Sequence, residues 1–228
     1  AQDGQIKSML KSSEASNNLT IAKIEIAIPI TDFTTATNIS FVDNEVQIQL
    51  GKAQGSFLGG EFSVEGAQWP FNNEQAVAVR LTEIDLEKLL ELDQKQGIVI
   101  TGRVSGELPI FYDGEHFLIE GGHLYNVGEG LIQVFDNPAV EELKTTNTQL
   151  KLAFDALENL HYYQLKSDVS MANDGYMLLV TAIKGKNPDL DNDVNLNLNL
   201  SYDLLGLLES LNITEHFEEK FIKGLQPN

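Results

Sequence analysis

The stretch that decides the fold is DVNLNLNLSYDLLGLLESL, residues 193–211. In its first half apolar and polar residues alternate, with one parity holding Val194, Leu196, Leu198, Leu200 and Tyr202, and the other Asn195, Asn197, Asn199 and Ser201. A period of two predicts a strand with one apolar and one polar face, although asparagine is depleted in strands. The second half places Leu204, Leu207, Leu208 and Leu211 at helical spacing. The stretch therefore predicts a two-faced strand whose asparagines hydrogen-bond across strands, followed by a helix that Asp203 caps.

The same alternation recurs along the chain and predicts a sheet of many strands. Strands are expected at residues 18–30, 38–50, 61–69, 75–82, 97–106, 129–135, 161–172 and 176–185, and a hairpin at 107–127. Asp113 and Gly114 form the turn of that hairpin, since Asp-Gly is a strong turn signal. Gly102 and Gly106 share a face with Val104 and indicate a bend or the close approach of another backbone.

Three further segments have helical spacing. Residues 82–92 predict a helix with Asp85 as N-cap, ending before Gly97. Residues 146–160 carry a stripe of Leu150, Ala153, Phe154, Leu157 and Leu160, and residues 214–225 form a last amphipathic helix. Together these patterns predict a mainly β, β-rich α+β fold, in which a few amphipathic helices pack on a twisted antiparallel sheet.

The chain is expected to form one domain over residues 1–228, because no Pro/Ser-rich linker divides it. Residues 59–69 resemble residues 113–124: each has a turn glycine, a glutamate, an apolar alternation and then Glu-Gly. This similarity suggests a repeated β-unit at 46–69 and 98–124. Chance likeness between two hairpins is the alternative. Residues 203–225 are expected to form a helical C-terminal cap.

Composition excludes several classes of protein. The net charge is −19, from 34 acidic and 15 basic residues, so binding to nucleic acid or to an anionic membrane surface is disfavoured. The absence of cysteine excludes disulfides and thiolate chemistry. No run of 18 apolar residues is present to span a bilayer as a helix. The first ten residues, AQDGQIKSML, look like the start of an excised fragment.

No catalytic or metal-binding constellation emerges from the residues. His116 and His123 are seven residues apart, which in a strand places them on opposite faces. Asp189, Asp191 and Asp193 copy the start of a calcium loop, but Val194 and Leu200 occupy the positions that need Gly and Glu, so a solvated acidic turn is the better interpretation. No cofactor is expected, and the chain is interpreted as a binding or structural protein, not an enzyme.

Several phrases of the sequence resemble, in order, those of the YdbH family, large bacterial envelope proteins of the AsmA-like group. The phrases are GRVSGELPIFYDGEHFLIEGGHLYNVGEGLI at 102–132, LKLAFDALENLHYYQLKSDV at 150–169 and KGKNPDLDNDVNLNLNLSYDLLGLLESL at 184–211. Upstream, SFLGGEFSVEG at 56–66 and IDLEKLLEL at 84–92 also fit. The resemblance covers about residues 40–225, and residues 1–40 have no counterpart in it.

The resemblance implies a long, strongly curved sheet, a taco-like half-barrel whose apolar groove holds phospholipid acyl chains. Such proteins are non-catalytic bridges that carry phospholipid between the inner and outer membranes of Gram-negative bacteria. The chain would then be the C-terminal fragment of a larger envelope protein, in the periplasmic part of a protein anchored in the inner membrane. The expected groove residues are Val194, Leu196, Leu198, Leu200, Phe117, Ile119, Ile100 and Val104.

The resemblance also implies a protein partner, a small YnbE-like outer-membrane lipoprotein that adds strands to the open edge of the sheet. The alternative function is therefore an envelope interaction module that accepts a partner strand. A third, weaker alternative follows from the label "dicarboxylate transport" that this domain type has carried. A dicarboxylate site needs convergent cations, and Arg80 and Arg103 are the only arginines. The sequence leaves open which strand is the edge, which parity faces the groove, and whether the helices cap the groove or pack outside it.

Overall fold

The structure, a computed structural model, describes residues 17–24, 30–42, 45–71, 75–92, 97–146, 148–190, 193–204 and 206. The strands are β1 (Asn17–Ile24), β2 (Ile30–Val42), β3 (Glu45–Phe57), β4 (Gly60–Val64), β5 (Gln68–Trp69), β6 (Val77–Asp85), β7 (Ile98–Ile100), β8 (Arg103–Tyr112), β9 (Phe117–Val127), β10 (Gly130–Val134), β11 (Leu160–Met171), β12 (Tyr176–Lys186) and β13 (Asp193–Asp203). The helices are α2 (Leu86–Glu91), α3 (Pro138–Thr146) and α4 (Thr148–Leu157).

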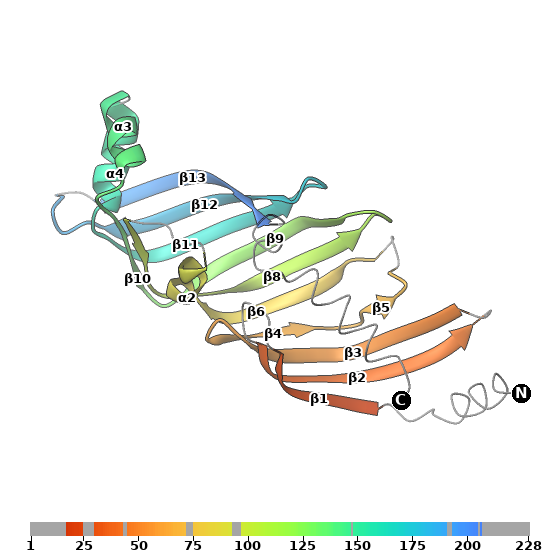
Figure 1. Cartoon of the computed structure of the whole chain (residues 1–228). Coiled ribbons are helices and arrows are strands. Elements are labelled where there is room, and N and C mark those ends of the chain that lie inside the picture. The colour runs from red at the N-terminus through yellow and green to blue at the C-terminus, as the bar shows by residue number, and fades with distance from the viewer. Residues whose placement is uncertain are drawn as a thin grey trace, which may run out of the picture.

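All thirteen strands form one open sheet in which each strand pair is antiparallel. The order β1-β2-β3-β4-β6-β8-β9-β11-β12-β13 follows the chain, so long strands pair with their neighbours in sequence. The short strands extend this meander: β5 pairs with β3, β10 with β11, and β7 with β10. The sheet curls into a half-barrel (Figure 1), which confirms the predicted β-rich, strongly curved antiparallel fold.

Bends within the strands accompany the curl. The register shifts between Leu81 and Ile84 in β6 and between Val169 and Met171 in β11. Glu83 and Gly121 have positive φ angles of 52° and 69° near these two shifts. Such bulges add a residue to one strand and increase the local twist. A sheet built with several of them bends instead of lying flat.

The predicted bend at Gly102 is confirmed, and a tyrosine occupies it. Gly102 has φ 106° and separates β7 from β8, so residues 97–106 form two strands instead of the single one expected. The Tyr162 hydroxyl donates a hydrogen bond to the Thr101 carbonyl at 2.7 Å. A Cβ added to Gly102 or Gly130 would lie 2.3 Å from that hydroxyl oxygen. The two glycines therefore make room for Tyr162, and burial raises its pKa.

Gly106 is the predicted site of close backbone approach. A Cβ at this position would lie 2.0 Å from the His123 carbonyl oxygen on β9. Only a residue without a side chain fits there. The glycines of this phrase thus have two different purposes, a bend at Gly102 and a close strand contact at Gly106.

The predicted hairpin and the first helix cap are confirmed. Asp113 accepts hydrogen bonds from the backbone N–H groups of Glu115 and His116 in the turn between β8 and β9, and these bonds lower the pKa of Asp113. Asp85 accepts the N–H of Glu87 at the start of α2. The helix expected at 82–92 is shorter, because residues up to Asp85 belong to β6.

The helix expected at residues 146–160 was wrong in its bounds. It ends at Leu157, and Leu160 begins β11. Leu160 still joins the same cluster as Leu157, fully buried, because the turn between them returns the chain to that cluster. A preceding helix, α3, was missed, since its sequence, PAVEELKTT, holds few apolar residues. Lys144 of α3 contacts Glu158 at 2.6 Å, Glu141 at 3.2 Å and Asp155 at 3.6 Å, which ties the two helices together.

Candidate functional site

The concave face of the sheet is the candidate site, because apolar side chains from many strands gather on it. One row of cross-strand neighbours on this face runs across β6, β8, β9, β11, β12 and β13. It consists of Leu81, Gly106, Leu124, Ser167, Thr181 and Leu198. The two hydroxyl groups of this row bond to each other, Ser167 to Thr181 at 2.9 Å, and are buried. No unpaired polar group of this row therefore faces the interior.

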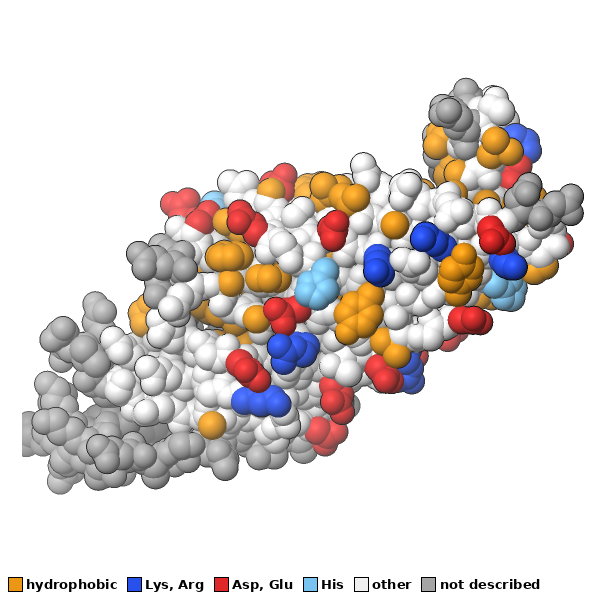
Figure 2. Space-filling view, turned by 180° about the vertical axis from the view of Figure 1, so that it is seen from behind, with side chains coloured by type: hydrophobic (Ala, Val, Ile, Leu, Met, Phe, Trp, Pro, Cys, Tyr) orange, Lys and Arg blue, Asp and Glu red, His pale blue; other side chains and the backbone are white. Residues whose placement is uncertain are grey.

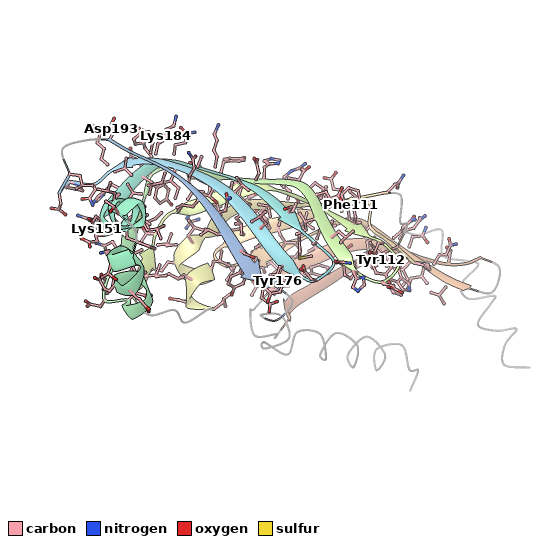
Figure 3. The ribbon with its side chains drawn as sticks, turned by 90° about the horizontal axis from the view of Figure 1, so that it is seen from above. Phe111, Tyr112, Lys151, Tyr176, Lys184 and Asp193 are labelled. Atoms are coloured by element: carbon pink, nitrogen blue, oxygen red, sulfur yellow. The ribbon has the colours of Figure 1, made fainter. Side chains whose placement is uncertain are left out.

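The adjacent row faces the opposite way and is polar. It consists of Arg80, Glu107, His123, Asp168, Val180 and Asn199 across the same strands. Five of these six are polar or charged, so the convex face is the solvated one. Figure 2 shows this face, with acidic and basic side chains interspersed among apolar ones. Figure 3 shows the arch from above, with Lys184 and Asp193 on its convex side.

Three buried clusters lie along the concave side. The largest joins Ile132, Val134, Ala156, Leu157, Leu160, Tyr162, Ile183 and Val194. The second holds Leu58, Ile84 and Val104, and the third Ile119, Val169 and Met171. Helix α4 contributes Ala156 and Leu157 to the first cluster, and Leu86 of α2 packs on both of the first two. Helices α3 and α4 lie under one side of the arch (Figure 3), so they close part of the concave face at that rim.

The opposite rim carries an open cavity of about 420 Å³. Its wall includes Val64, Phe71, Val77, Val79, Ile110, Tyr112, Phe117, Ile119, Met171 and Leu204. Four aromatic rings stand at its edge: Phe71 lies 5.4 Å from Trp69, 5.6 Å from Tyr112 and 5.4 Å from Phe117, between ring centroids. Trp69 is 55% exposed and Phe117 44%, which is unusual for such large apolar side chains. Among the described residues, none that lines this cavity is charged.

The eight residues expected to line a groove fall in three places. Val194 is buried in the first cluster, and Leu196, Leu198 and Ile100 pack against it. Val104 and Ile119 are buried in the second and third clusters. Phe117 stands at the rim, and Leu200 is 49% exposed near the end of edge strand β13. Sequence reasoning missed the aromatic side chains Trp69, Phe71 and Tyr112, because their strands are short or end at the rim and show no alternation.

The asparagines of β13 face solvent as expected, but their predicted cross-strand hydrogen bonds are wrong. Within the described residues, the side chains of Asn195, Asn197 and Asn199 make none. Their cross-strand neighbours on β12 are Lys184, Ala182 and Val180, and the last two offer no polar side-chain group. Within the described residues β13 pairs only with β12, so no second described strand supplies a partner.

The start of the C-terminal helix agrees with the sequence as far as it is described. Asp203 accepts the backbone N–H of Gly206 at 2.8 Å, as an N-cap does. Leu204 packs against the third cluster. The remainder of the predicted helices, from Leu207 onward, lies outside the described residues.

The features expected of a metal or solute site are not found in the described part of the chain. No group of three or more His, Asp or Glu side chains there could hold a metal ion. Asp191, in the acidic turn considered for calcium, lies outside that part. Arg80 and Arg103 pair with Glu107 and Glu83 at 3.1 and 3.3 Å. Both pairs lie on the convex face, away from the cavity.

Within the described residues, no helix combines the length and apolar character needed to cross a bilayer. Comparison with curated proteins and with solved structures gave no match. A family profile matches residues 2–226, and its description reads "Intermembrane phospholipid transport protein YdbH". The chain therefore belongs to the YdbH-like family of intermembrane phospholipid transport proteins.

Proposed function

We propose that this chain is a segment of a periplasmic bridge, in which the concave face of the sheet holds phospholipid acyl chains. The observation that carries the proposal is that strands from β6 to β13 place apolar side chains on the concave side, among them Leu81, Leu124 and Leu198, while the hydroxyls between them bond to each other. An acyl chain needs an uninterrupted apolar surface, because each methylene taken from water gains about 0.8 kcal/mol. The headgroup stays in solvent along the open side of the arch.

The proposed lipid contacts differ in role according to where they lie. Phe117 and Leu200, which are about half exposed, offer surface that an acyl chain would cover. Leu196 and Leu198 are partly buried and form the floor of the groove. Val194, Ile119 and Val104 are nearly inaccessible, so they shape the groove from beneath. Ile100 supports the end near α2 and α4.

The proposed segment is non-catalytic. Movement along a continuous apolar surface breaks no covalent bond and needs no acid, base or nucleophile. The wall of the cavity fits this role, because Tyr112 is its one ionisable side chain within the described part of the chain. The family association with transport between membranes supports a location in the periplasm.

Photocrosslinking tests the groove. A photoreactive residue is placed at Leu198 or Phe117, in the proposed groove, and at Asn197 or Glu120, which are exposed on the other parity. The protein is produced with its natural envelope and analysed for attached phospholipid. Attachment at the first pair and not at the second is expected. Equal labelling at all four positions, or lipid at the convex positions only, would contradict an acyl groove.

We also propose that β13 accepts a strand from a YnbE-like outer-membrane lipoprotein. The supporting observation is that β13 pairs only with β12 in the described residues, which leaves one row of backbone groups available. A photoreactive residue at Asn199 should crosslink to the lipoprotein. Asp168 is the matched control, since it lies in the same convex row but on the interior strand β11. Equal crosslinking from Asp168 would point to a surface contact instead of strand addition.

A dicarboxylate site finds less support. Both arginines are engaged with glutamates on the convex face. A closed pocket with convergent polar groups would be required, and the 420 Å³ cavity is open and mostly apolar. Calorimetry with succinate, which should show no heat of binding, separates this alternative from the first two.

A further inference from the structure

The convex side of β12 changes character along its length, one strand in from the open edge of the sheet. Tyr176, Leu178 and Val180 alternate along its first half and are 50%, 41% and 47% exposed, which is unusual for three large apolar side chains in a row. The same parity then continues through Ala182 to Lys184. Figure 3 shows Tyr176 and Lys184 toward opposite ends of this strand. β12 therefore presents an apolar half and a cationic half to solvent.

The positive charge of the cationic half is only partly matched. Lys186 contacts Asp193 of β13 at 3.5 Å, directly across the strand pair. Lys184, two residues before it, lies opposite Asn195, which carries no charge. Among the described residues Lys184 has no ion-pair partner. One cation beside the edge is thus available to a further strand.

The edge strand leaves these groups uncovered, because its own convex side chains are short. Opposite the convex residues of β12, from Tyr176 to Lys184, β13 places Asp203, Ser201, Asn199, Asn197 and Asn195. A strand added to β13 would lie two spacings from β12, or about 10 Å. Long side chains on that strand would extend over these short residues and meet the side chains of β12.

β13 also lacks the features that keep edge strands from pairing. Its register with β12 is unbroken over the 11 residues Asp193–Asp203, which include no proline, lysine or arginine. Bulges, prolines and lysines are the usual means of blocking an edge. A second copy of this chain is a poor occupant of this edge, since its own β13 would offer only short polar side chains to the apolar half of β12.

We infer that the strand accepted by β13 comes from a different protein and has a two-part convex side that complements β12. Opposite Ser201 and Asn199 it carries large apolar residues, which cover the apolar half. Opposite Asn197 and Asn195 it carries acidic residues, which pair with Lys184. Because every strand pair in the sheet is antiparallel, the apolar half comes first in the partner's sequence and the acidic half second. The inference rests on the strand addition proposed above and names the chemistry of the partner.

Two synthetic peptides of equal composition test this polarity. Each is as long as β13 and has Leu and Val at the groove-facing positions. In antiparallel pairing, the forward peptide places Tyr and Val opposite Ser201 and Asn199. It places two Glu residues opposite Asn197 and Asn195, and the reversed peptide exchanges these two halves. Fluorescence anisotropy with the full chain should show at least about fivefold tighter binding of the forward peptide, because favourable cross-strand contacts replace unfavourable ones at four positions.

Substitutions on β12 should locate the source of this preference. Lys184→Glu should weaken the forward peptide about fivefold at about 0.15 M salt, since an attraction becomes a repulsion. The matched control is Lys166→Glu, exposed on the same face but on the interior strand β11, with a change below about twofold. Leu178→Ser should weaken the forward peptide about threefold. Its control is Val127→Ser, at a similarly exposed position on β9.

The outcomes separate this inference from strand addition itself. Equal affinity of the two peptides, or tighter binding of the reversed one, would overturn the polarity even if the lipoprotein still crosslinks from Asn199. Dimerisation of the chain that is lost in Lys184→Glu would assign the edge to a second copy and overturn the inference as well. No binding of either peptide, together with no crosslink from Asn199, would reject both the polarity and strand addition.

Discussion

Side chains on alternate positions of β13 have opposite surroundings although they are neighbours in sequence. Leu198 faces Thr181 and packs against the largest cluster, whereas Asn197 is exposed beside Ala182. A carboxylate is therefore costly at one position and hydrated at the other.

The variant Leu198→Asp should lose about 2–4 kcal/mol of unfolding free energy, from the lost packing and the desolvated charge. Asn197→Asp should change it by less than about 0.5 kcal/mol. Urea denaturation followed by circular dichroism measures both. Similar losses in the two variants would mean that the parity of the strand has been assigned to the wrong face.

Gly106 and Gly51 provide a second comparison at the scale of single residues. Gly106→Ala would place a methyl group 2.0 Å from the His123 carbonyl oxygen, which requires β8 and β9 to separate. Gly51→Ala would place its methyl group 3.2 Å from the Ala36 Cβ and 3.4 Å from the Ala36 carbonyl oxygen, which are much milder contacts. We expect the first variant to lose more than about 3 kcal/mol and the second about 1 kcal/mol or less. Thermal unfolding temperatures should rank in the same order, and the reverse order would refute the close strand contact.

At the scale of elements, α3 is held to α4 chiefly through Lys144. Its side chain is 11% exposed and contacts three carboxylates, whereas Lys151 is 56% exposed and contacts only Asp155, at 2.6 Å. The hydrogen bond that Lys144 donates to Glu158, together with the neighbouring carboxylates, raises the pKa of Lys144, against the effect of burial.

Lys144→Met should loosen the junction by about 1–2 kcal/mol, because it leaves three carboxylates facing one another. Lys151→Met should cost about 0.5 kcal/mol or less, as for an exposed pair on one helix. Hydrogen exchange of α3 amides reports the difference. Faster exchange in Lys151→Met than in Lys144→Met would contradict this arrangement.

Acid should loosen the same junction. The hydrogen bond from Lys151, followed by the charges of Lys151 and Lys144, lowers the pKa of Asp155. A lowered carboxylate pKa stabilises the fold above the unfolded value, about 3.9, and that contribution is lost as the pH falls through the folded pKa. Exchange of α3 amides should therefore accelerate below about pH 4 in the natural protein. Asp155→Asn should lack this acid step.

Some of these elements could be predicted from the sequence, and others could not. The alternation in β13, the Asp113–Gly114 turn and the Asp85 cap were sufficient to place β13, the β8–β9 hairpin and α2, because each depends on local geometry. The curl was expected only from the family resemblance, since it arises from bulges at Glu83 and Gly121 and from the fit of Tyr162 beside Gly102. Those features depend on which strands pair, and alternation does not reveal pairing.

The candidate site was predictable in part for the same reason. The concave residues of β13 follow from parity once one face is known to be buried. The rim aromatics Trp69 and Phe71 come from a two-residue strand and the turn after it, which carry no periodic pattern. Their role appears only when the meander brings them beside Tyr112 and Phe117. The repeat proposed for residues 46–69 and 98–124 stays a prediction.

At the scale of the whole molecule, ten of the described strands follow one another across the sheet, namely β1, β2, β3, β4, β6, β8, β9, β11, β12 and β13. The short strands β5, β7 and β10 are left out of this series, because they only extend it locally. Nine spacings of about 4.8 Å give a stack about 43 Å long. Because this axis is perpendicular to the strands, the groove runs from one edge strand to the other. Lipid at Leu198 and at Val64 would then lie near different ends of one path, and both positions should label with phospholipid in the same preparation.

The order of the meander has a consequence for how such proteins change over evolution. Each long strand pairs with the next one in the chain, so a duplicated or deleted hairpin alters only its two neighbours and leaves every other register intact. One hairpin adds two strands, or about 10 Å, to the length of the stack. Relatives from bacteria with wider or narrower envelopes should therefore differ by whole hairpins, and the spacing between their glycine-bearing turns should change in steps of two strands.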